Sequence, residues 1–423
     1  ENCFVYRTIE DLDAIRAASL NSKSGVVIGG GLLGLEAANG LLKRGVDVTV
    51  IHDMACLMNR QLDTEAAHLL QKQLEDNGMK FRMGAMTKEI VALDDGHLSH
   101  ISFKNGDDLP TDLVIMAVGI RPNVSLAKQI GLQVDKAILV NDTMQTFDPS
   151  IYAVGDAVEK TDALDNSAAL VPLANIANRH GRVIADHIAG KAVRPVDAQG
   201  TAIVKVFDLA VATTGWNAKR LAAAGKSFTE IHTHPNSHAT YYPGASQFSL
   251  KLIFEPKSGE ILGAQGVGRD GVDKRIDVIA TALRAGVTAP ALADLELAYA
   301  PPFSSAKDPV NMLGYIAENV ISGITETAQW SELDKYKSEG YAFVDVRSAS
   351  EFANGTIPGS VNIPVDEMRE RHTEINNKKV IVNCQVGQRG HVATMLLRSL
   401  GYHAKNLDGG YLTWINSPAA TLK

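Results

Sequence analysis

The 423-residue sequence has very few cysteines: only Cys3, Cys56 and Cys384. Three thiols cannot build a disulfide framework, and their scarcity fits a reducing compartment, so we expect a cytoplasmic protein. The sequence also lacks any run of about 18 consecutive apolar residues, the length that a membrane-spanning helix requires. We therefore expect no membrane partner.

A basic surface is missing as well. The formal net charge is -7, and residues of both signs are interspersed along the chain. Nucleic acids and anionic lipids select a basic stripe, which this sequence does not offer, so small molecules or proteins are the expected partners. With 45% hydrophobic residues over this length, the chain can form two to four domains around sizeable cores.

An initiator methionine is absent too. The sequence opens at "ENCFVYRTIEDLDAIRAA", within a helix-like pattern. On this ground we interpret the sequence as a fragment.

The first interpretable unit, residues 23–131, has a β-α-β pattern. In "SGVVIGGGLLGLEAANGLLKRGVDVTVIHD", an apolar strand runs into a turn with Gly29, Gly31 and Gly34, and an amphipathic helix and a second strand follow. The first glycine of G-x-G-x-x-G permits the turn, the second lets a pyrophosphate approach, and the third lets helix and strand pack closely. The strand-turn-helix context favours dinucleotide binding over a purely structural turn.

Two further positions belong to this prediction. The second strand ends near His52 and Asp53, where an acid would bind the cofactor ribose; Asp53 favours NADH, although it stands one position late and leaves NADPH open. In "LVIMAVGIRPN" an apolar strand stops at Gly119. Either the chain returns beneath the cofactor at this point, or Gly119 is an ordinary strand end.

Residues 132–198 repeat this logic with another ligand. "TFDPSIYAVGDAVE" predicts a short strand, Tyr152 to Val154, that ends in Gly155 and Asp156, and a helix is predicted after Pro172. A carboxylate at the carboxyl edge of a parallel strand can accept hydrogen bonds from a polyol.

Together, "GGGLLGLEAA", "AVGIRPN", "IYAVGDAVE" and "PLANIANRHGRVIADHIAG" resemble the flavin-dependent pyridine nucleotide disulfide oxidoreductases. The resemblance implies an NAD(P) domain inserted in an FAD domain, with Asp156 on the ribityl chain and Leu173 and Ala174 near the isoalloxazine. It also implies that the first FAD strand and the redox cysteine precede this sequence, so we assign neither Cys3 nor Cys56 that role.

The pattern from residue 199 to 323 predicts two or three antiparallel strands with a Pro-Lys-Ser-Gly turn, followed by two helices. It resembles the dimerisation domain of that superfamily, and "YYPG", "DKRID" and "AYAPPFSSAKDPVN" resemble coenzyme A disulfide and persulfide reductases. The resemblance implies a homodimer in which Tyr241 or Tyr242 and Tyr299 flank the redox site, while Lys307 and Asn178 contact coenzyme A. Alternatively, the tyrosines only pack at the interface.

Three histidines in "HTHPNSHATYY", His232, His234 and His238, stand close together. They lack a carboxylate or cysteine at helical spacing, so we expect a solvated loop rather than a metal site.

The last unit, residues 325–423, predicts a strand ending in "DVR", a strand "KKVIVNC" and a helix "GHVATMLLRSLGY". Cys384 ends its strand where loop N–H groups and a helix dipole converge, which favours a thiolate or persulfide. The loop Cys384, Gln385, Val386, Gly387, Gln388, Arg389 places arginine after four intervening residues. A loop of this length forms a ring small enough for a sulfur atom. Phosphatases of similar design insert one more residue and hold a phosphate.

With "DVR", "EF" and "IPGSVNIP", this unit resembles a rhodanese domain, although Thr356 stands where histidine is usual and the loop is more neutral than that of many thiosulfate transferases. These departures leave the sulfur donor open. A catalytically inert rhodanese fold remains an alternative, although inert copies generally lack the cysteine.

We therefore predict an α/β protein with nested Rossmann-like FAD and NAD(P) domains, an α+β dimerisation domain and a C-terminal rhodanese domain. The expected function is NAD(P)H-dependent, flavin-dependent reduction of a coenzyme A persulfide, polysulfide or disulfide, with Cys384 carrying sulfane sulfur and Arg389 and the loop amides stabilising the anion. A stand-alone sulfurtransferase and a non-catalytic NADH-binding regulator remain alternatives. Residues 1–155 also resemble the NAD module of nitrite reductase large subunits, but the downstream chain lacks the cysteines that a siroheme and iron–sulfur centre would need.

Overall fold

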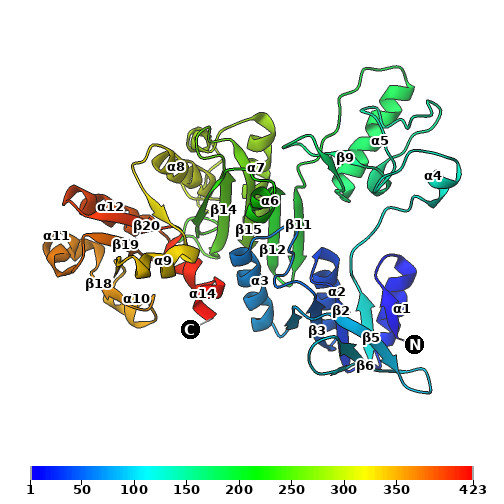
Figure 1. Ribbon diagram of the computed structural model, residues 1–423, viewed down its shortest axis with the longest axis horizontal. Helices are drawn as coiled ribbons and strands as arrows, with labels where there is room; N and C mark the ends of the chain where they lie inside the picture. Colours follow the sequence, from blue (N-terminus) through cyan, green and yellow to red (C-terminus); the bar gives the residue numbers. More distant parts are fainter. Residues whose placement is uncertain (1, 422–423) are drawn as a thin grey trace.

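The computed structural model describes residues 2–421, which form three β-sheets of five strands each and two smaller sheets. Figure 1 shows three lobes around a central antiparallel sheet, with the C-terminal helix α14 (Pro418–Thr421) beside α3 (Thr64–Asp76), a contact that ties the last segment of the chain to the first lobe. None of the helices in this range is long and apolar enough to cross a bilayer.

The first sheet is parallel, in the order β1-β8-β2-β3-β4. Buried valine, leucine and isoleucine side chains fill its strands because helices cover one face and a small antiparallel sheet covers the other. The strands are β1 (Cys3–Val5), β2 (Ser24–Ile28), β3 (Asp47–His52), β4 (Lys80–Met83) and β8 (Leu113–Met116), and α1 (Ile9–Ser19), α2 (Leu32–Leu42) and α3 accompany them. A strand therefore precedes the first helix, which corrects the expectation that the sequence opens within a helix.

A small antiparallel sheet follows, with β5 (Thr87–Ala92), β6 (Leu98–Phe103) and β7 (Leu109–Pro110). The chain then passes through α4 (Ser125–Gln129) into a lobe that contains the 3-10 turn η1 (Gly155–Ala157), the hairpin β9 (Lys160–Thr161) and β10 (Ala168–Ala169), and α5 (Ala174–Ile188). The predicted strand at 152–154 is wrong: Tyr152 makes only an isolated bridge to Gln145 before the chain turns into η1.

The central sheet has the antiparallel order β11-β12-β15-β14-β13. It contains β11 (Ala202–Val206), β12 (Leu209–Gly215), β13 (Thr229–Thr233), β14 (Phe248–Phe254) and β15 (Ile261–Gly268), with helices α6 (Ala218–Ala223), α7 (Val272–Ala285) and α8 (Pro309–Ile321) and the 3-10 turn η2 (Pro290–Asp294). The prediction of two or three strands was too low. The Pro-Lys-Ser-Gly turn does join β14 to β15.

The C-terminal sheet is parallel, in the order β16-β20-β19-β17-β18. Its strands are β16 (Thr327–Ala328), β17 (Ala342–Asp345), β18 (Ser360–Asn362), β19 (Lys379–Asn383) and β20 (His403–Leu407). Helices α9 (Leu333–Ser338), α10 (Ala349–Ala353), α11 (Met368–Arg371), α12 (Gln388–Ser399) and α13 (Gly410–Ile415) surround it, with 3-10 turns at Trp330–Glu332, Val365–Glu367 and His372–Glu374.

Candidate functional site

The glycine turn between β2 and α2 shows why each glycine is needed. Gly29 has φ +120, and a Cβ there would lie 2.2 Å from the carbonyl oxygen of Ala117. A Cβ on Gly34 would lie 1.9 Å from the carbonyl oxygen of Gly29, so helix and strand can touch only through glycine. A Cβ on Gly31, by contrast, would meet nothing within 4 Å.

Gly31 is also the N-cap of α2, and no side chain caps that end. The free N–H groups and the positive end of the helix dipole therefore face open space, which is where a pyrophosphate would approach. These features fit a bound dinucleotide.

His52 and Asp53, at the end of β3, lie next to this turn. The His52 side chain is mostly buried, with Nδ1 3.3 Å from Asp53 Oδ1 and Nε2 3.3 Å from Asn59 Oδ1, while Asp53 is exposed. Gly119 has φ +96 and follows Ala117, whose backbone contacts the glycine turn. The structure thus brings the predicted dinucleotide residues to one edge of the first sheet.

In the lobe that carries α5, Gly155 has φ +74 and its carbonyl oxygen accepts a hydrogen bond of 2.7 Å from the buried Lys160 Nζ. Asp156 is half-buried in η1. Leu173 is the N-cap of α5 and Ala174 its first residue, again without a side-chain cap. The helix that was predicted after Pro172 is confirmed.

The predicted tyrosines come together in part. The hydroxyl oxygens of Tyr241 and Tyr299 lie 3.2 Å apart, and both side chains are exposed. Tyr242 instead packs edge-on against His238. Of the two alternatives, Tyr241 and Tyr242, the structure therefore brings Tyr241 into contact with Tyr299.

Asn178 and Lys307 are both exposed. Asn178 lies on α5, and Lys307 precedes α8 and places its Nζ 5.5 Å from the centre of the Tyr315 ring. Figure 1 shows α5 and α8 in different parts of the molecule, so a single chain does not bring these two residues together.

Cys384 is fully buried at the end of β19. Gly387, with φ +94, turns the chain directly into α12, whose N-terminus carries no side-chain cap. Tyr411 N–H donates to the Cys384 carbonyl oxygen at 2.7 Å, and Leu412 N–H donates to that of Gln385 at 3.0 Å. Val386 and Gln388 complete the short loop from Cys384 to Arg389. The backbone N–H groups of this loop and the N-terminus of α12 suit a sulfur anion.

Arg389 belongs to this loop, but it is also held by a carboxylate that the sequence reasoning missed. Its guanidinium donates to Glu351 on α10 at 2.7 and 2.8 Å. Hydrogen bonding to Arg389 lowers the pKa of Glu351 to about 2, and the contacts with Glu351 and Cys384 raise the pKa of Arg389. The "EF" of the motif was the available signal for Glu351.

Arg347 was also missed, although "DVR" contains it. It is buried, ion-paired with Asp345 at 2.6 Å, and donates to Gln385 Oε1 at 3.2 Å. Its guanidinium also stacks 4.0 Å from the centre of the Tyr411 ring. Thr356 donates to the same Asp345 at 3.3 Å.

The histidine prediction needs correction. His238 is half-buried, but His232 and His234 are only 3% and 7% exposed, so they do not lie in a solvated loop. Burial lowers the pKa of His234 to about 3, and its Nε2 lies 2.7 Å from Thr413 Oγ1. Alternation in sequence could not reveal that the C-terminal domain covers these residues.

Family comparisons agree with this geometry. Residues 1–181 match the pyridine nucleotide-disulphide oxidoreductase model, residues 201–309 its dimerisation-domain model, and residues 328–417 the rhodanese-like domain model. An NADH oxidase from Methanocaldococcus jannaschii is 36% identical over 315 residues, which is 74% of this chain and 69% of the relative. The chain belongs to the pyridine nucleotide-disulphide oxidoreductase family.

A coenzyme A disulfide reductase from Staphylococcus haemolyticus is 35% identical over 322 residues, covering 75% of this chain and 71% of the relative. The solved structure of reduced Bacillus anthracis CoADR-RHD superposes with a TM-score of 0.94 at 41% identity, over 98% of this chain and 75% of the other. An NAD-dependent persulfide reductase from A. fulgidus gives 0.91 at 36% identity, over 98% and 76%.

This chain is thus an oxidoreductase of that family with a C-terminal rhodanese-like domain, and the comparisons support NAD(P)H-dependent disulfide or persulfide reduction. The family implies FAD and NAD(P)H as cofactors. The predicted fold class is confirmed.

Proposed function

We propose that this chain reduces persulfides, polysulfides or disulfides of coenzyme A with NAD(P)H, and that Cys384 carries the sulfane sulfur. One observation carries the proposal: a chain of this reductase family also holds a buried cysteine in a six-residue loop at an uncapped helix N-terminus. The names of the relatives, which include coenzyme A disulfide and persulfide reductases, support this substrate class.

In this function the two halves of the chain have separate tasks. Gly29, Gly31 and Gly34 leave room for NAD(P)H, and we expect Asp156 in η1 and the uncapped N-terminus of α5 to hold FAD. Bound FAD supplies the transfer of two electrons from the nicotinamide to a sulfur–sulfur bond. We propose the division 1–131 for the NAD(P) domain, 132–198 for the FAD segment, 199–323 for dimerisation and 325–423 for the rhodanese domain.

At Cys384 the chemistry is sulfur transfer without net oxidation. The Cys384 thiolate attacks the outer sulfur of a persulfide donor, the donor S–S bond breaks as the Cys384 S–S bond forms, and the donor thiolate leaves. The loop N–H groups and Arg389 stabilise the anionic persulfide that results. One chain that holds both sites keeps the transferred sulfur at a high effective concentration near the reductase.

We also propose that the chain acts as a homodimer. The dimerisation-domain match covers residues 201–309, and the large side chains of Tyr241, Tyr299 and Phe303 are exposed there. In such a dimer the tyrosine pair and Lys307 of one chain would face α5, with Asn178, of the other.

The test compares the parent with Cys384→Ala. We expect persulfide turnover to be lost in the variant, whereas the NADH-dependent bleaching of a flavin absorption band and the disulfide reduction that the parent shows are retained. Unchanged persulfide turnover would refute a carrier role for Cys384, and a protein that transfers sulfur from thiosulfate to cyanide without any NADH-dependent activity would favour the simple sulfurtransferase.

A further inference from the structure

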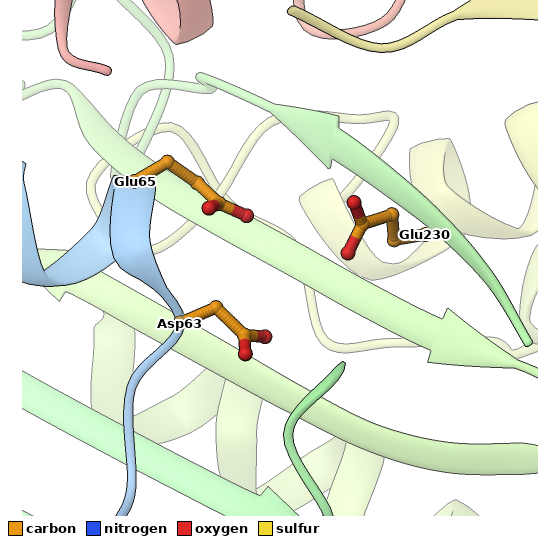
Figure 2. Close-up of side chains that lie close together, drawn as sticks. All are labelled: Asp63, Glu65 and Glu230. Carbon is orange, nitrogen blue, oxygen red and sulfur yellow. The ribbon is translucent and has the colours of Figure 1, made fainter. Parts of the chain in front are cut away.

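Three carboxylates gather where the first lobe meets the central sheet. Asp63 and Glu65, at the start of α3, and Glu230 on β13 place oxygens within 4.8 Å of one another. Figure 2 shows the three side chains close together. Lys251 Nζ lies among them, at 2.9 Å, 2.5 Å and 2.7 Å respectively. Burial opposes the charge of Lys251, but the three carboxylates raise its pKa, so its ammonium group fills the position that a metal ion would take.

The network continues through His232 into the C-terminal domain. His232 Nε2 lies 3.1 Å from Glu65 Oε1, and Nδ1 lies 2.6 Å from Asp408 Oδ2, while the His232 backbone N–H donates to Asp408 Oδ1 at 3.0 Å. All three residues are at most 9% exposed. Burial favours the neutral ring, but Asp408 and then Glu65 raise the pKa of His232 to about 10, so both ring nitrogens donate.

Asp408 directly precedes the segment that backs the Cys384 loop. Besides the bonds from Tyr411 and Leu412 to the loop carbonyls, a Cβ on Gly410 would lie only 2.4 Å from the Cys384 carbonyl oxygen. A Cβ on Gly409 would lie 2.8 Å from His232 Cβ. Close contacts therefore connect His232, through residues 408–412, with the Cys384 loop. In such close packing a shift of Asp408 displaces the loop backbone.

We propose that His232 and Asp408 are positioning residues for sulfur transfer: the Glu65–His232–Asp408 contact between three parts of the molecule holds residues 409–412 against the Cys384 loop and aims its N–H groups at the sulfur. The functional meaning rests on the proposed role of Cys384 as sulfur carrier. Loop N–H groups stabilise an anion only when they point at it. A displacement of residues 409–412 therefore makes both the Cys384 thiolate and its persulfide less stable.

Two substitutions at one position test this. In His232→Asn the side-chain amide nitrogen takes the place of Nδ1 and keeps the bond to Asp408 Oδ2. In His232→Gln it takes the place of Nε2 and keeps the bond to Glu65, so that only the backbone N–H of residue 232 still donates to Asp408. Each full-length variant is titrated for the Cys384 thiolate by ultraviolet absorbance against its own Cys384→Ala reference, and is assayed for persulfide sulfur transfer. We expect His232→Asn to behave like the parent, and His232→Gln to titrate at higher pH and to transfer sulfur about tenfold more slowly or worse.

Gln329→Met is the control for docking alone, because the Gln329 side chain spans the same interface, with Nε2 donating to the Glu230 carbonyl oxygen at 3.0 Å. It leaves the backbone bond from Asp408 N–H to the neighbouring Ala328 carbonyl oxygen, at 2.9 Å, in place. It should leave both readouts unchanged. Equal losses of sulfur transfer in His232→Asn and His232→Gln, or a loss in Gln329→Met, would show that the contact only docks the domains and would overturn the proposal. An unchanged thiolate titration in all three variants would overturn it as well.

If His232→Gln does not fold, Asp408→Asn carries the same expectation, since it keeps the shape and removes the charge. The thiolate titration does not require sulfur turnover. Failure of the proposed function, seen as persulfide turnover that survives Cys384→Ala, can therefore be distinguished from failure of the positioning role.

Discussion

Arg389 is the one cation of the Cys384 loop, and it is not free. Glu351 binds it with two hydrogen bonds and is itself fixed by Ser348 in a capping box at the start of α10. The buried Arg347 is likewise paired with Asp345. Each arginine near the cysteine thus has its own carboxylate, so the site does not present the excess positive charge that would attract a dianionic donor.

Glu351→Gln should change which donor is used. With the carboxylate removed, Arg389 keeps its charge, and we expect the kcat/KM for thiosulfate to rise roughly fivefold relative to that for a persulfide, a size set by a partly exposed ion pair. The measurement is the ratio of the two kcat/KM values at fixed ionic strength.

Glu374→Gln is the matched control, because Glu374 pairs with Arg371 on the surface of the same domain. An unchanged donor ratio in Glu351→Gln, or an equal rise in the control, would show that Glu351 does not set donor preference.

The Glu351 pair also has a defined pH range. Because the folded pKa of Glu351 is lowered from 4.5 to about 2, its stabilising contact is complete above pH 4.5 and is lost as the pH falls towards 2. The melting temperature, measured by thermal unfolding from pH 6 to pH 3, should fall more steeply for the parent than for Glu351→Gln. Parallel curves would contradict this expectation.

At the scale of elements, the N-cap and the interior of α2 each have one glycine with open surroundings. Gly31 at its N-terminus and Gly40 in its interior would each accept a Cβ without any contact within 4 Å. Gly31→Ala should fold normally and raise the KM for NADH, since the methyl group occupies the space for the pyrophosphate. Gly40→Ala should leave the KM unchanged and stabilise the helix by about 0.5–1 kcal/mol. Equal KM values in both variants would count against dinucleotide binding at this turn.

Gly34→Ala probes the same turn by packing. Its Cβ would collide with the Gly29 carbonyl oxygen, which is backbone and cannot move aside cheaply. We expect a loss of roughly 1–3 kcal/mol in the free energy of unfolding, measured by urea denaturation. A variant as stable as the parent would show that helix and strand can separate without cost.

Over the whole molecule, His232 should make the domain junction sensitive to alkaline pH. Its folded pKa is raised from 6.5 to about 10, so its stabilising charge is fully present below pH 6.5 and declines as the pH rises to about 10. The melting temperature of the parent, relative to that of His232→Asn, should therefore fall over this range. A constant difference would mean that the His232 charge does not stabilise the junction.

Local patterns were enough for part of this molecule. The β-α-β unit around Gly29, Gly31 and Gly34, and the strand, loop and helix around Cys384, lie within short stretches of sequence, where hydrophobic period and glycine spacing act directly. The strands of the central sheet were harder, because β13 and β15 are buried on both faces or lined by small residues, so they lack a clear alternation.

The sequence by itself determined the order of the domains, the glycine turn and the strand, loop and helix around Cys384, because neighbours along the chain create all of them. Only the tertiary structure decided what surrounds that loop: Glu351 on Arg389, Asp345 on Arg347, and His232 between Glu65 and Asp408, residues 167 and 176 positions apart from His232. Charge pairing of this kind depends on distance in space and on burial, and neither quantity is written in sequence spacing.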